Sequence, residues 1–209
     1  MRLKHIKGAE EIVSNSKYVV KDYLDYRGKF NTLFNNNNPI HIEIGMGKGN
    51  FIIENAIKYP NINFIGIEKY DSVIVKAVRR LDTLELPNLR LIRMDATKID
   101  EVFDKEISEI YLNFSDPWPK DRHAKRRLTS PNFLNKYKSI VKDKVIITFK
   151  TDNRKLFEYS VMTFNSEQFT IEELSLDLYN DDITDNIPTE YEMKFHSKGF
   201  PIYKIRVYK

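Results

Sequence analysis

Five times in succession, a short apolar run typical of a β-strand is followed by a run with helical periodicity. Units of this kind join parallel strands through helical crossovers, so the alternation predicts an α/β fold with a mainly parallel sheet and helices on both faces. The predicted strand and helix pairs are Ile40–Ile44 with Phe51–Tyr59, Ile62–Ile67 with Ser72–Leu84, Leu89–Met94 with Ile99–Phe103, Ile110–Phe114 with Pro131–Val141, and Lys144–Phe149 with Arg154–Phe164.

After the fifth unit the alternation stops, and two more strands are expected. They cover Phe169–Leu178 and Pro201–Tyr208, with a polar, acidic segment between them. Apolar and polar residues alternate along the second of these strands, which is typical of an antiparallel edge strand. We therefore expect an antiparallel C-terminal edge strand on an otherwise parallel sheet.

The chain divides near a run of four asparagines, Asn35–Asn38, which precedes Pro39 and indicates a polar turn. Its length of 209 residues suits one domain of ordinary to large size. We expect a basic N-terminal arm over residues 1–38 and the main domain over residues 39–209. The basic residues at the start of the arm are Arg2, Lys4 and Lys7.

A glycine loop joins the first predicted strand to the first helix, with Gly45, Gly47 and Gly49 at alternate positions. Glycines at such a junction let the backbone turn sharply and approach a nucleotide-like ligand. The spacing differs from the dinucleotide fingerprint, and Glu43 just before the loop would repel a phosphate. A carboxylate favours an ammonium instead, which points to S-adenosylmethionine, a cofactor with an amino-acid tail and no phosphate.

The second and third predicted strands also end in acids. Glu68 follows the second strand about 20 residues after the loop, where it can accept hydrogen bonds from two ribose hydroxyls. Asp95 and Ala96 follow the third strand, where the carboxylate can accept the adenine amino group. Three successive strands that each end in an acid support a cofactor site over a simple tight turn.

A compact block after the fourth predicted strand combines Asp116, two prolines, the only tryptophan, Trp118, and a basic run from Lys120 to Arg127. In an open α/β sheet, ligands bind at the edge where the strands end, which is where Asp116 lies. The net charge of the chain is only +4, so the local clustering of cations is the argument for nucleic acid.

Composition excludes several classes of site. There is no cysteine, and the histidines show no ligand spacing, so we expect neither disulfides nor a metal site. The N-terminus lacks the apolar core of a signal peptide, and no apolar run approaches the roughly 20 residues that span a bilayer. We expect no membrane association and a cytoplasmic location.

Taken in order, these motifs resemble those of the bacterial tRNA (guanine-N7-)-methyltransferases, from about Ile40 to the C-terminus. The Asp-Pro-Trp-Pro-Lys block with its basic tail is the specific part, although Ser115 stands where the family's block has proline. The matching motifs are Glu43-Ile-Gly45-x-Gly47-x-Gly49, Gly66-Ile-Glu68, Asp95-Ala96, Asp116-Pro-Trp-Pro-Lys120, Arg122-His-x-Lys-Arg-Arg127, Thr151-Asp152 and Thr189-x-Tyr-Glu192.

The resemblance implies a Rossmann-like methyltransferase fold and an enzyme that uses S-adenosyl-L-methionine to methylate N7 of a guanine in tRNA, in the variable loop. It implies that Asp116 is catalytic and also contacts the cofactor. The other implied cofactor contacts are Glu43, Gly45, Gly47, Gly49, Glu68, Asp95 and Ala96. Implied contacts to the target nucleotide are Lys120, Asp152, Thr189, Glu190, Tyr191 and Glu192. Implied contacts to tRNA are Arg122, His123, Ala124, Lys125, Arg126 and Arg127.

Several of these residues also have a simpler structural interpretation. Trp118 can stack on a base or pack into the core, and the basic run can be a solvated helix face. The Thr189–Glu192 segment has the pattern of a capping box, which starts a helix whether or not it contacts substrate. Asp152 can cap the helix expected from Arg154.

Two other functions remain open from the sequence. The first is an amino-methyltransferase acting on adenine or cytosine in nucleic acid, because those enzymes carry a related Asp/Asn-Pro-Pro-aromatic loop. Trp118 replaces the second proline here, and a basic segment follows, which fits that group poorly. The second is a non-catalytic RNA-binding module, which has no physical need for three acidic cofactor positions. The protein is expected to be a monomer or a homodimer.

Overall fold

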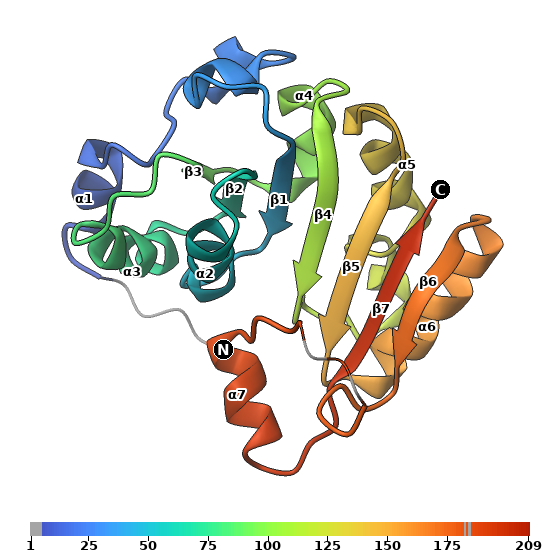
Figure 1. The fold of residues 1–209 in the computed structure, drawn as a ribbon. Coiled ribbons are helices and arrows are strands. Elements are labelled where there is room, and N and C mark those ends of the chain that lie inside the picture. Colours follow the sequence, from blue (N-terminus) through green and yellow to red (C-terminus); the bar gives the residue numbers. More distant parts are fainter. Residues whose placement is uncertain (1–5, 182, 184) are drawn as a thin grey trace.

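The computed structural model describes residues 6–181, 183 and 185–209. A seven-stranded sheet in the order β3-β2-β1-β4-β5-β7-β6 forms the centre of the molecule (Figure 1). Strands β1 to β5 are parallel, and β7 is antiparallel to both of its neighbours. The strands are β1 (Ile40–Ile44), β2 (Asn63–Glu68), β3 (Leu89–Arg93), β4 (Ile107–Asn113), β5 (Ile146–Thr151), β6 (Thr170–Ser175) and β7 (Tyr203–Tyr208).

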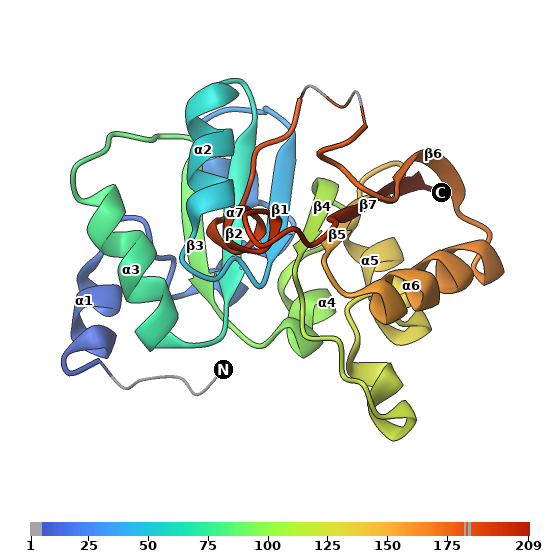
Figure 2. The same cartoon turned by 90° about the horizontal axis from the view of Figure 1, so that it is seen from below.

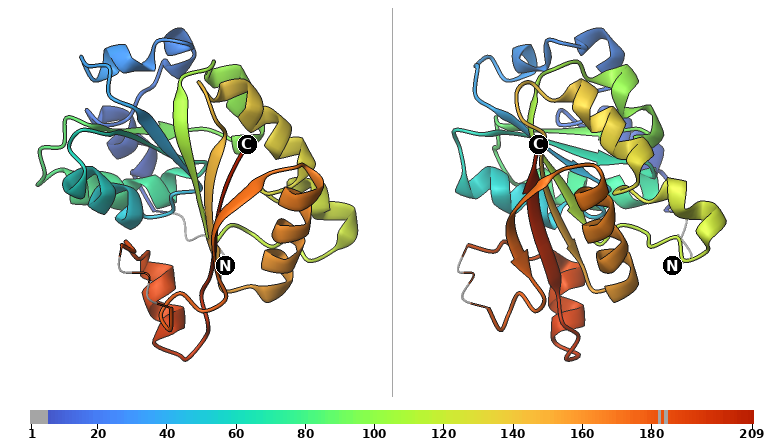
Figure 3. Two further views of the ribbon diagram at one scale, coloured as in Figure 1. Left: turned by 45° about the vertical axis from the view of Figure 1, so that its right-hand side comes forward. Right: turned by 90° about the vertical axis from the view of Figure 1, so that its right-hand side faces the viewer.

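Helices cover both faces of the sheet, which confirms the predicted α/β architecture. Helices α2 and α3 lie on one face over β1 to β3, with α1 packed against α3, and α4, α5 and α6 lie on the opposite face (Figures 1 and 3). The α-helices are α1 (Ala9–Asn15), α2 (Asn50–Lys58), α3 (Asp71–Leu81), α4 (Ile99–Val102), α5 (Pro131–Ile140), α6 (Arg154–Ser166) and α7 (Glu190–His196). The short 3₁₀ helices are η1 (Tyr23–Tyr26), η2 (Phe30–Leu33), η3 (Ala96–Lys98) and η4 (Asp121–Arg126). Among the described residues, no helix is long and apolar enough to span a membrane.

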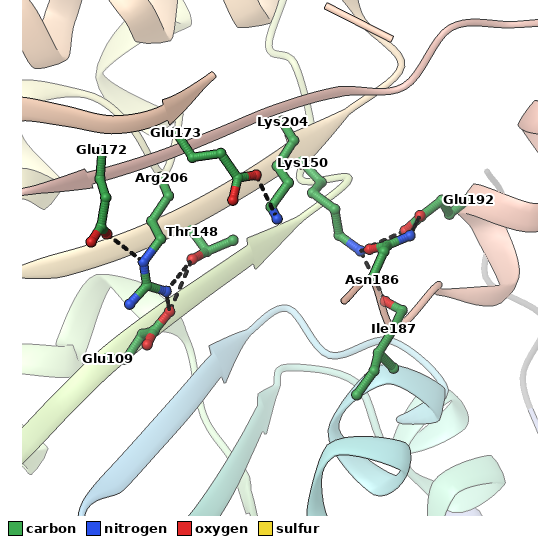
Figure 4. A network of polar contacts seen from close by, with 10 residues as sticks. All are labelled: Glu109, Thr148, Lys150, Glu172, Glu173, Asn186, Ile187, Glu192, Lys204 and Arg206. Carbon is green, nitrogen blue, oxygen red and sulfur yellow. Dashed lines mark hydrogen bonds and ion pairs between the residues drawn. The ribbon is translucent and has the colours of Figure 1, made fainter. Parts of the chain in front are cut away.

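The five predicted strand and helix units are all present, and no boundary in them shifts by more than three residues. The start of β4 is one of the larger shifts. The strand begins at Ile107, three residues before the expected Ile110. Its early part contains the buried Glu109, which accepts a hydrogen bond of 2.9 Å from the Thr148 hydroxyl of β5 and pairs with Arg206 of β7 (Figure 4). A buried acid has no apolar signature, so the sequence pattern did not reveal this part of the strand.

The C-terminal strand β7 is antiparallel as predicted, but it lies inside the sheet between β5 and β6. The edge strand is β6, and the burial of the two strands explains the order. Ile205 and Val207 of β7 are fully buried, whereas Ile171 and Leu174 of β6 are each 43% exposed. The strand that carries buried apolar residues takes the interior position, and β6 carries an irregularity of register that is common at sheet edges.

The described part of the segment before β1 packs against the rest of the domain. Phe30 and Phe34 are buried in the main hydrophobic core beside the sheet. This part of the expected basic arm therefore contributes to the fold and does not stand apart from it. Lys7 is exposed, whereas Arg2 and Lys4 lie outside the described residues.

Candidate active site

The glycine loop after β1 adopts a backbone that glycine accepts without strain. Gly45, Gly47 and Gly49 have positive φ angles of 77°, 58° and 79°. A Cβ on Gly49 would lie 2.8 Å from the Cβ of Ala77, so this glycine also lets α2 approach α3 closely. A Cβ on Gly45 or Gly47 would meet no atom within 4 Å, so a ligand can approach the backbone at these two positions.

Glu43 in β1 is buried and only partly satisfied. Its Oε1 accepts a hydrogen bond of 2.9 Å from Nδ2 of Asn113 at the end of β4. Within the described part of the chain, Glu43 Oε2 and Asn113 Oδ1 are buried without a hydrogen-bond partner. Burial raises the pKa of Glu43 to about 8. Two buried acceptor atoms without donors fit a ligand that brings its own N–H groups, such as an ammonium.

Glu68 connects the end of β2 to the glycine loop. Its carboxylate accepts backbone hydrogen bonds from Lys69 N at 2.7 Å and from Gly47 N at 3.2 Å. Burial raises the pKa of Glu68, and the charge of Asp116 raises it further. Asp116 follows β4, so it lies at the same end of the sheet as Glu68.

Asp95 follows β3 and caps the short helix η3. It accepts hydrogen bonds from Thr97 N at 2.9 Å and from Lys69 Nζ at 2.7 Å. The hydrogen bond from Lys69 holds the pKa of Asp95 low, at about 2. Ala96, the other residue assigned here, packs partly buried against the main core. Asp95 is therefore an ionised acceptor at the same end of the sheet as Glu68.

Asp116 lies on an exposed loop just after β4, and the backbone around it is strained. Phe114 and Trp118 on either side have positive φ angles of 50° and 41°, which non-glycine residues rarely adopt. Strain of this kind persists only where other contacts enforce it, and it is common in loops that present a functional group. Ser115 is half-buried in this loop, and nothing in the structure explains a serine there.

Arg127 supplies contacts that enforce this loop. Its guanidinium donates hydrogen bonds of 3.0 Å to the Pro117 carbonyl and 3.0 Å to the Trp118 carbonyl, and it stacks 4.2 Å from the Tyr159 ring. The residue is only 9% exposed. Arg127 therefore differs from the other cations of its run, because its charge is used to hold the loop that carries Asp116.

The rest of the basic run forms η4, which projects from the sheet edge. Arg122, Lys125 and Arg126 are exposed on it, and His123 and Ala124 are half-buried. Figure 2 views this edge directly and shows the segment after β4 extending away on the side of α4 and α6. An exposed cationic projection beside the strand ends is suited to contact a nucleic-acid backbone.

Trp118 does not pack into the core, and its stacking on a base stays a prediction. It is half-buried, its ring meets His123 edge-on with a centroid distance of 5.8 Å, and the Arg126 guanidinium lies 4.9 Å from its centroid. The ring therefore lies outside the core and connects the Asp116 loop to η4. Lys120, between the loop and η4, is exposed.

Helix α7 begins with the capping box that the sequence pattern predicts. The Thr189 side chain accepts a hydrogen bond from Glu192 N, and the Glu192 side chain accepts one from Thr189 N. Tyr191 is 45% exposed, and its pKa is raised by burial and by the nearby charge of Asp152. Asp152 itself does not cap α6, because Asn153 does so by accepting from Leu156 N. Asp152 is thus available near Tyr191.

A fully buried ion pair fixes α7 to the end of β5. Lys150 Nζ lies 2.6 Å from Glu192 Oε2, and their side chains are 2% and 0% exposed (Figure 4). Lys150 also donates to Asn186 Oδ1 and to the Ile187 carbonyl, both at 3.0 Å. Glu192 is therefore placed to hold the helix, while Glu190 and Tyr191 are exposed on its surface.

Comparisons with known proteins match this geometry. A family model described as "Putative methyltransferase" matches residues 37–205. A curated tRNA (guanine-N(7)-)-methyltransferase of Listeria innocua is 50% identical over 207 residues, covering 98% of this chain and 97% of the relative. The protein of the same name from Bacillus licheniformis is 47% identical with the same coverage. The chain belongs to the tRNA (guanine-N(7)-)-methyltransferase family.

Solved structures with low sequence identity share the fold of this methyltransferase. An antibiotic-related methyltransferase has a TM-score of 0.67 at 14% identity, covering 87% of this chain and 93% of its own. The 16S rRNA methyltransferase KamB has a TM-score of 0.64 at 12% identity, covering 86% and 92%. The Rossmann-like methyltransferase fold implied by the sequence is thereby confirmed.

Sequence reasoning missed Lys150 and Asn113 of this methyltransferase. Asn113 is the next-to-last residue of the predicted strand Ile110–Phe114, and Lys150 directly follows the predicted strand Lys144–Phe149. A polar residue at such a place suggests only that the strand is ending. In a parallel sheet these ends point toward the ligand edge, so a buried lysine or asparagine there is a usable signal. Among the described residues, no group of three or more histidines and acids could hold a metal ion.

Proposed function

We propose that this chain transfers a methyl group from S-adenosylmethionine to N7 of a guanine in tRNA, in the variable loop, forming 7-methylguanosine. The observation that carries the proposal is the position of Asp116 just after β4, which lies beside β1 in the sheet. The proposed catalytic carboxylate therefore lies at the same sheet edge as Glu43 and Glu68. The family membership and the exposed cations of η4 support a tRNA substrate.

The residues at the strand ends fit S-adenosylmethionine, which supplies a methyl group activated on a sulfonium. Glu43 and Asn113 offer buried acceptors for its ammonium, and the open backbone at Gly45 and Gly47 lets the ligand approach closely. The Glu68 carboxylate suits the ribose hydroxyls. Asp95, with Ala96 beside it, suits the adenine amino group.

Asp116 has a positional and electrostatic role in this proposal. Guanine N7 carries a lone pair and no proton, so methylation there requires alignment of donor and acceptor and no general base. The Asp116 carboxylate can accept hydrogen bonds from N1–H and the 2-amino group of guanine. It also stabilises the positive charge that develops on the purine during transfer. Adenine has no N1–H and would leave the carboxylate unpaired, which favours guanine.

The remaining site residues divide into contacts and supports. In this proposal Lys120, Asp152 and Tyr191 contact the nucleotide, together with Thr189 and Glu190 at the start of α7. The exposed members of the basic run, Arg122, Lys125 and Arg126, with His123 and Ala124 between them, bind the tRNA backbone. Glu192 and Arg127 act as positioning residues, because one fixes α7 and the other fixes the Asp116 loop.

All of the proposed site residues belong to one chain. The proposal therefore holds both for a monomer and for a homodimer. A tRNA substrate also supports a cytoplasmic location.

The decisive experiment combines the protein, labelled S-adenosylmethionine and bulk tRNA from a strain that lacks this modification. Chemical cleavage at 7-methylguanine then maps the product, and cleavage at one guanine is expected. Labelled DNA, or label on an exocyclic amine of adenine or cytosine, would instead identify an amino-methyltransferase. Binding of tRNA without any label transfer would identify a non-catalytic RNA-binding module.

A further inference from the structure

Four aromatic rings form a continuous row that begins beside the Asp116 loop and follows α7. Phe114, two residues before Asp116, lies 5.0 Å from the Tyr191 ring. Tyr191 stacks on Phe195 with a centroid distance of 4.2 Å and an angle of 15° between the rings. Phe195 lies 5.6 Å from Phe200. These four residues are called the aromatic row below.

Two members of the aromatic row are too exposed to belong to the hydrophobic core. Tyr191 is 45% and Phe200 is 49% exposed, and Met193 on the same helix is 49% exposed. The buried Lys150–Glu192 pair already fixes α7 to β5, so the rings are not its main attachment. A contiguous exposed aromatic surface beside an active site is typical of a binding surface.

The charges around the aromatic row favour an anionic partner. Both acids of α7 are paired, Glu190 with Lys48 and Glu192 with Lys150. Lys194 and Lys198 form no ion pair with any described residue, and Lys198 Nζ lies 5.6 Å from the centroid of Phe195. Aromatic faces interleaved with unpaired cations are the surface that single-stranded nucleic acid recognises through base stacking and phosphate contacts.

We propose that the aromatic row is a stacking platform for the unpaired nucleotides that flank the target guanine. This inference rests on the proposed function. Proteins recognise the bases of RNA loops after these are splayed out of the stack, so the target guanine must be unstacked before it reaches the site. Its neighbours then lose a stacking partner, and the aromatic row replaces it. Phe114 is the ring at the Asp116 end of the row, and Phe200 is the ring at the other end.

The protein-side test replaces Phe200 with leucine. We expect Phe200→Leu to weaken tRNA binding and raise KM by between about fivefold and a hundredfold, because one stacked base loses its ring. The value of kcat should stay unchanged, since stacking is equal in the ground and transition states. Phe200→Tyr should restore KM. The control is Leu24→Ala, which removes a side chain that is 58% exposed in η1, away from α7 (Figure 1).

The RNA-side test uses tRNA with a single abasic nucleotide at each position flanking the target guanine. At one of these positions, the loss of the base should weaken tRNA binding by the wild-type protein as much as Phe200→Leu does. When Phe200→Leu is combined with that abasic tRNA, the loss of affinity should be no larger than for either change alone. Additive losses at every position would overturn the proposal. Unchanged tRNA binding by Phe200→Leu would also overturn it, and would point to a protein partner for this surface. Failure of the wild-type protein to methylate tRNA would instead refute the proposed function.

Discussion

The proposed cofactor side and the proposed substrate side of the site are built differently. On the cofactor side, Glu43, Glu68 and Asp95 belong to adjacent parallel strands or the residues just after them, and the sheet fixes their positions. On the substrate side, Asp116 lies on an exposed loop and α7 is far away in sequence. Both substrate elements are held by a few side-chain contacts between distant residues. The cofactor side should therefore tolerate changes that disable the substrate side.

The Lys150–Glu192 pair offers the strongest test of this difference. We expect Lys150→Met to lower the free energy of unfolding by about 3–5 kcal/mol, because it leaves the buried carboxylate of Glu192 without its cation. Urea denaturation measures the loss. Affinity for S-adenosylmethionine, measured on the folded variant, should change less than the free energy of unfolding does. Some change is expected, because the Lys150 charge also lowers the pKa of Glu43.

The double variant Lys150→Met with Glu192→Met is the control, because it removes both charges together. It should recover most of the lost stability, since replacing a whole buried pair with apolar side chains is often neutral. Equal losses in the single and double variants would show that the charge of Glu192 is not the cause.

Asp116→Asn tests whether the substrate side performs the chemistry. We expect kcat to fall by about 100- to 1000-fold, the usual loss when an electrostatic contact to the transition state is removed. The melting temperature should stay close to wild type, because the side chain is exposed, and cofactor affinity should fall far less than kcat. Asp121→Asn, an exposed acid in η4, is the matched control and should retain activity. Full activity of Asp116→Asn would assign the catalytic role to another residue.

Arg127→Met and Arg126→Met compare two neighbouring arginines with different contacts. Arg127→Met removes two hydrogen bonds to the Asp116 loop, so we expect stability to fall by about 1.5–3 kcal/mol and kcat to fall with it. Arg126→Met should change stability by less than about 0.5 kcal/mol. It should weaken tRNA binding and reduce the salt dependence of binding by slightly under one unit. If the two variants lost stability, kcat and tRNA affinity to the same extent, the distinction between Arg126 as a tRNA contact and Arg127 as a support of the loop would be wrong.

The sequence located the strands of the proposed cofactor side and their ends because these signals are local. Strands β1 and β2 are buried along nearly their whole length, so they appear as continuous apolar runs, and the acids follow directly. The parallel direction of the first five strands and the α/β class of the fold follow from the same repeated strand and helix units. The order of β6 and β7 did not follow, because pairing between strands far apart in sequence depends on which one can be buried on both sides.

The substrate side could be predicted only in part. Asp116 and the capping box of α7 have local patterns, and both were located. Arg127 cannot be distinguished from Arg126 by sequence, because its role depends on carbonyl groups nine and ten residues earlier that only the folded loop brings near. Lys150 meets its partner 42 residues later in the chain, so its burial leaves no local pattern.

The cofactor side makes a prediction of its own, through the raised pKa of Glu43. With a pKa of about 8, Glu43 is mostly protonated in the free protein at neutral pH. An ammonium favours the carboxylate, so binding S-adenosylmethionine should release this proton. Binding should therefore tighten as the pH rises from about 6 toward 8, by at most tenfold per pH unit, or about 1.4 kcal/mol.

Glu43→Gln separates this effect from titration of the ligand. The glutamine cannot ionise, so its cofactor affinity should be weaker and should lack this part of the pH dependence. The amino group of the ligand titrates in the same way with both proteins, so the ratio of their dissociation constants isolates Glu43. A ratio that grows with pH means that the buried carboxylate meets the ammonium. A constant ratio would assign the ammonium to other acceptors and leave Glu43 a structural partner of Asn113.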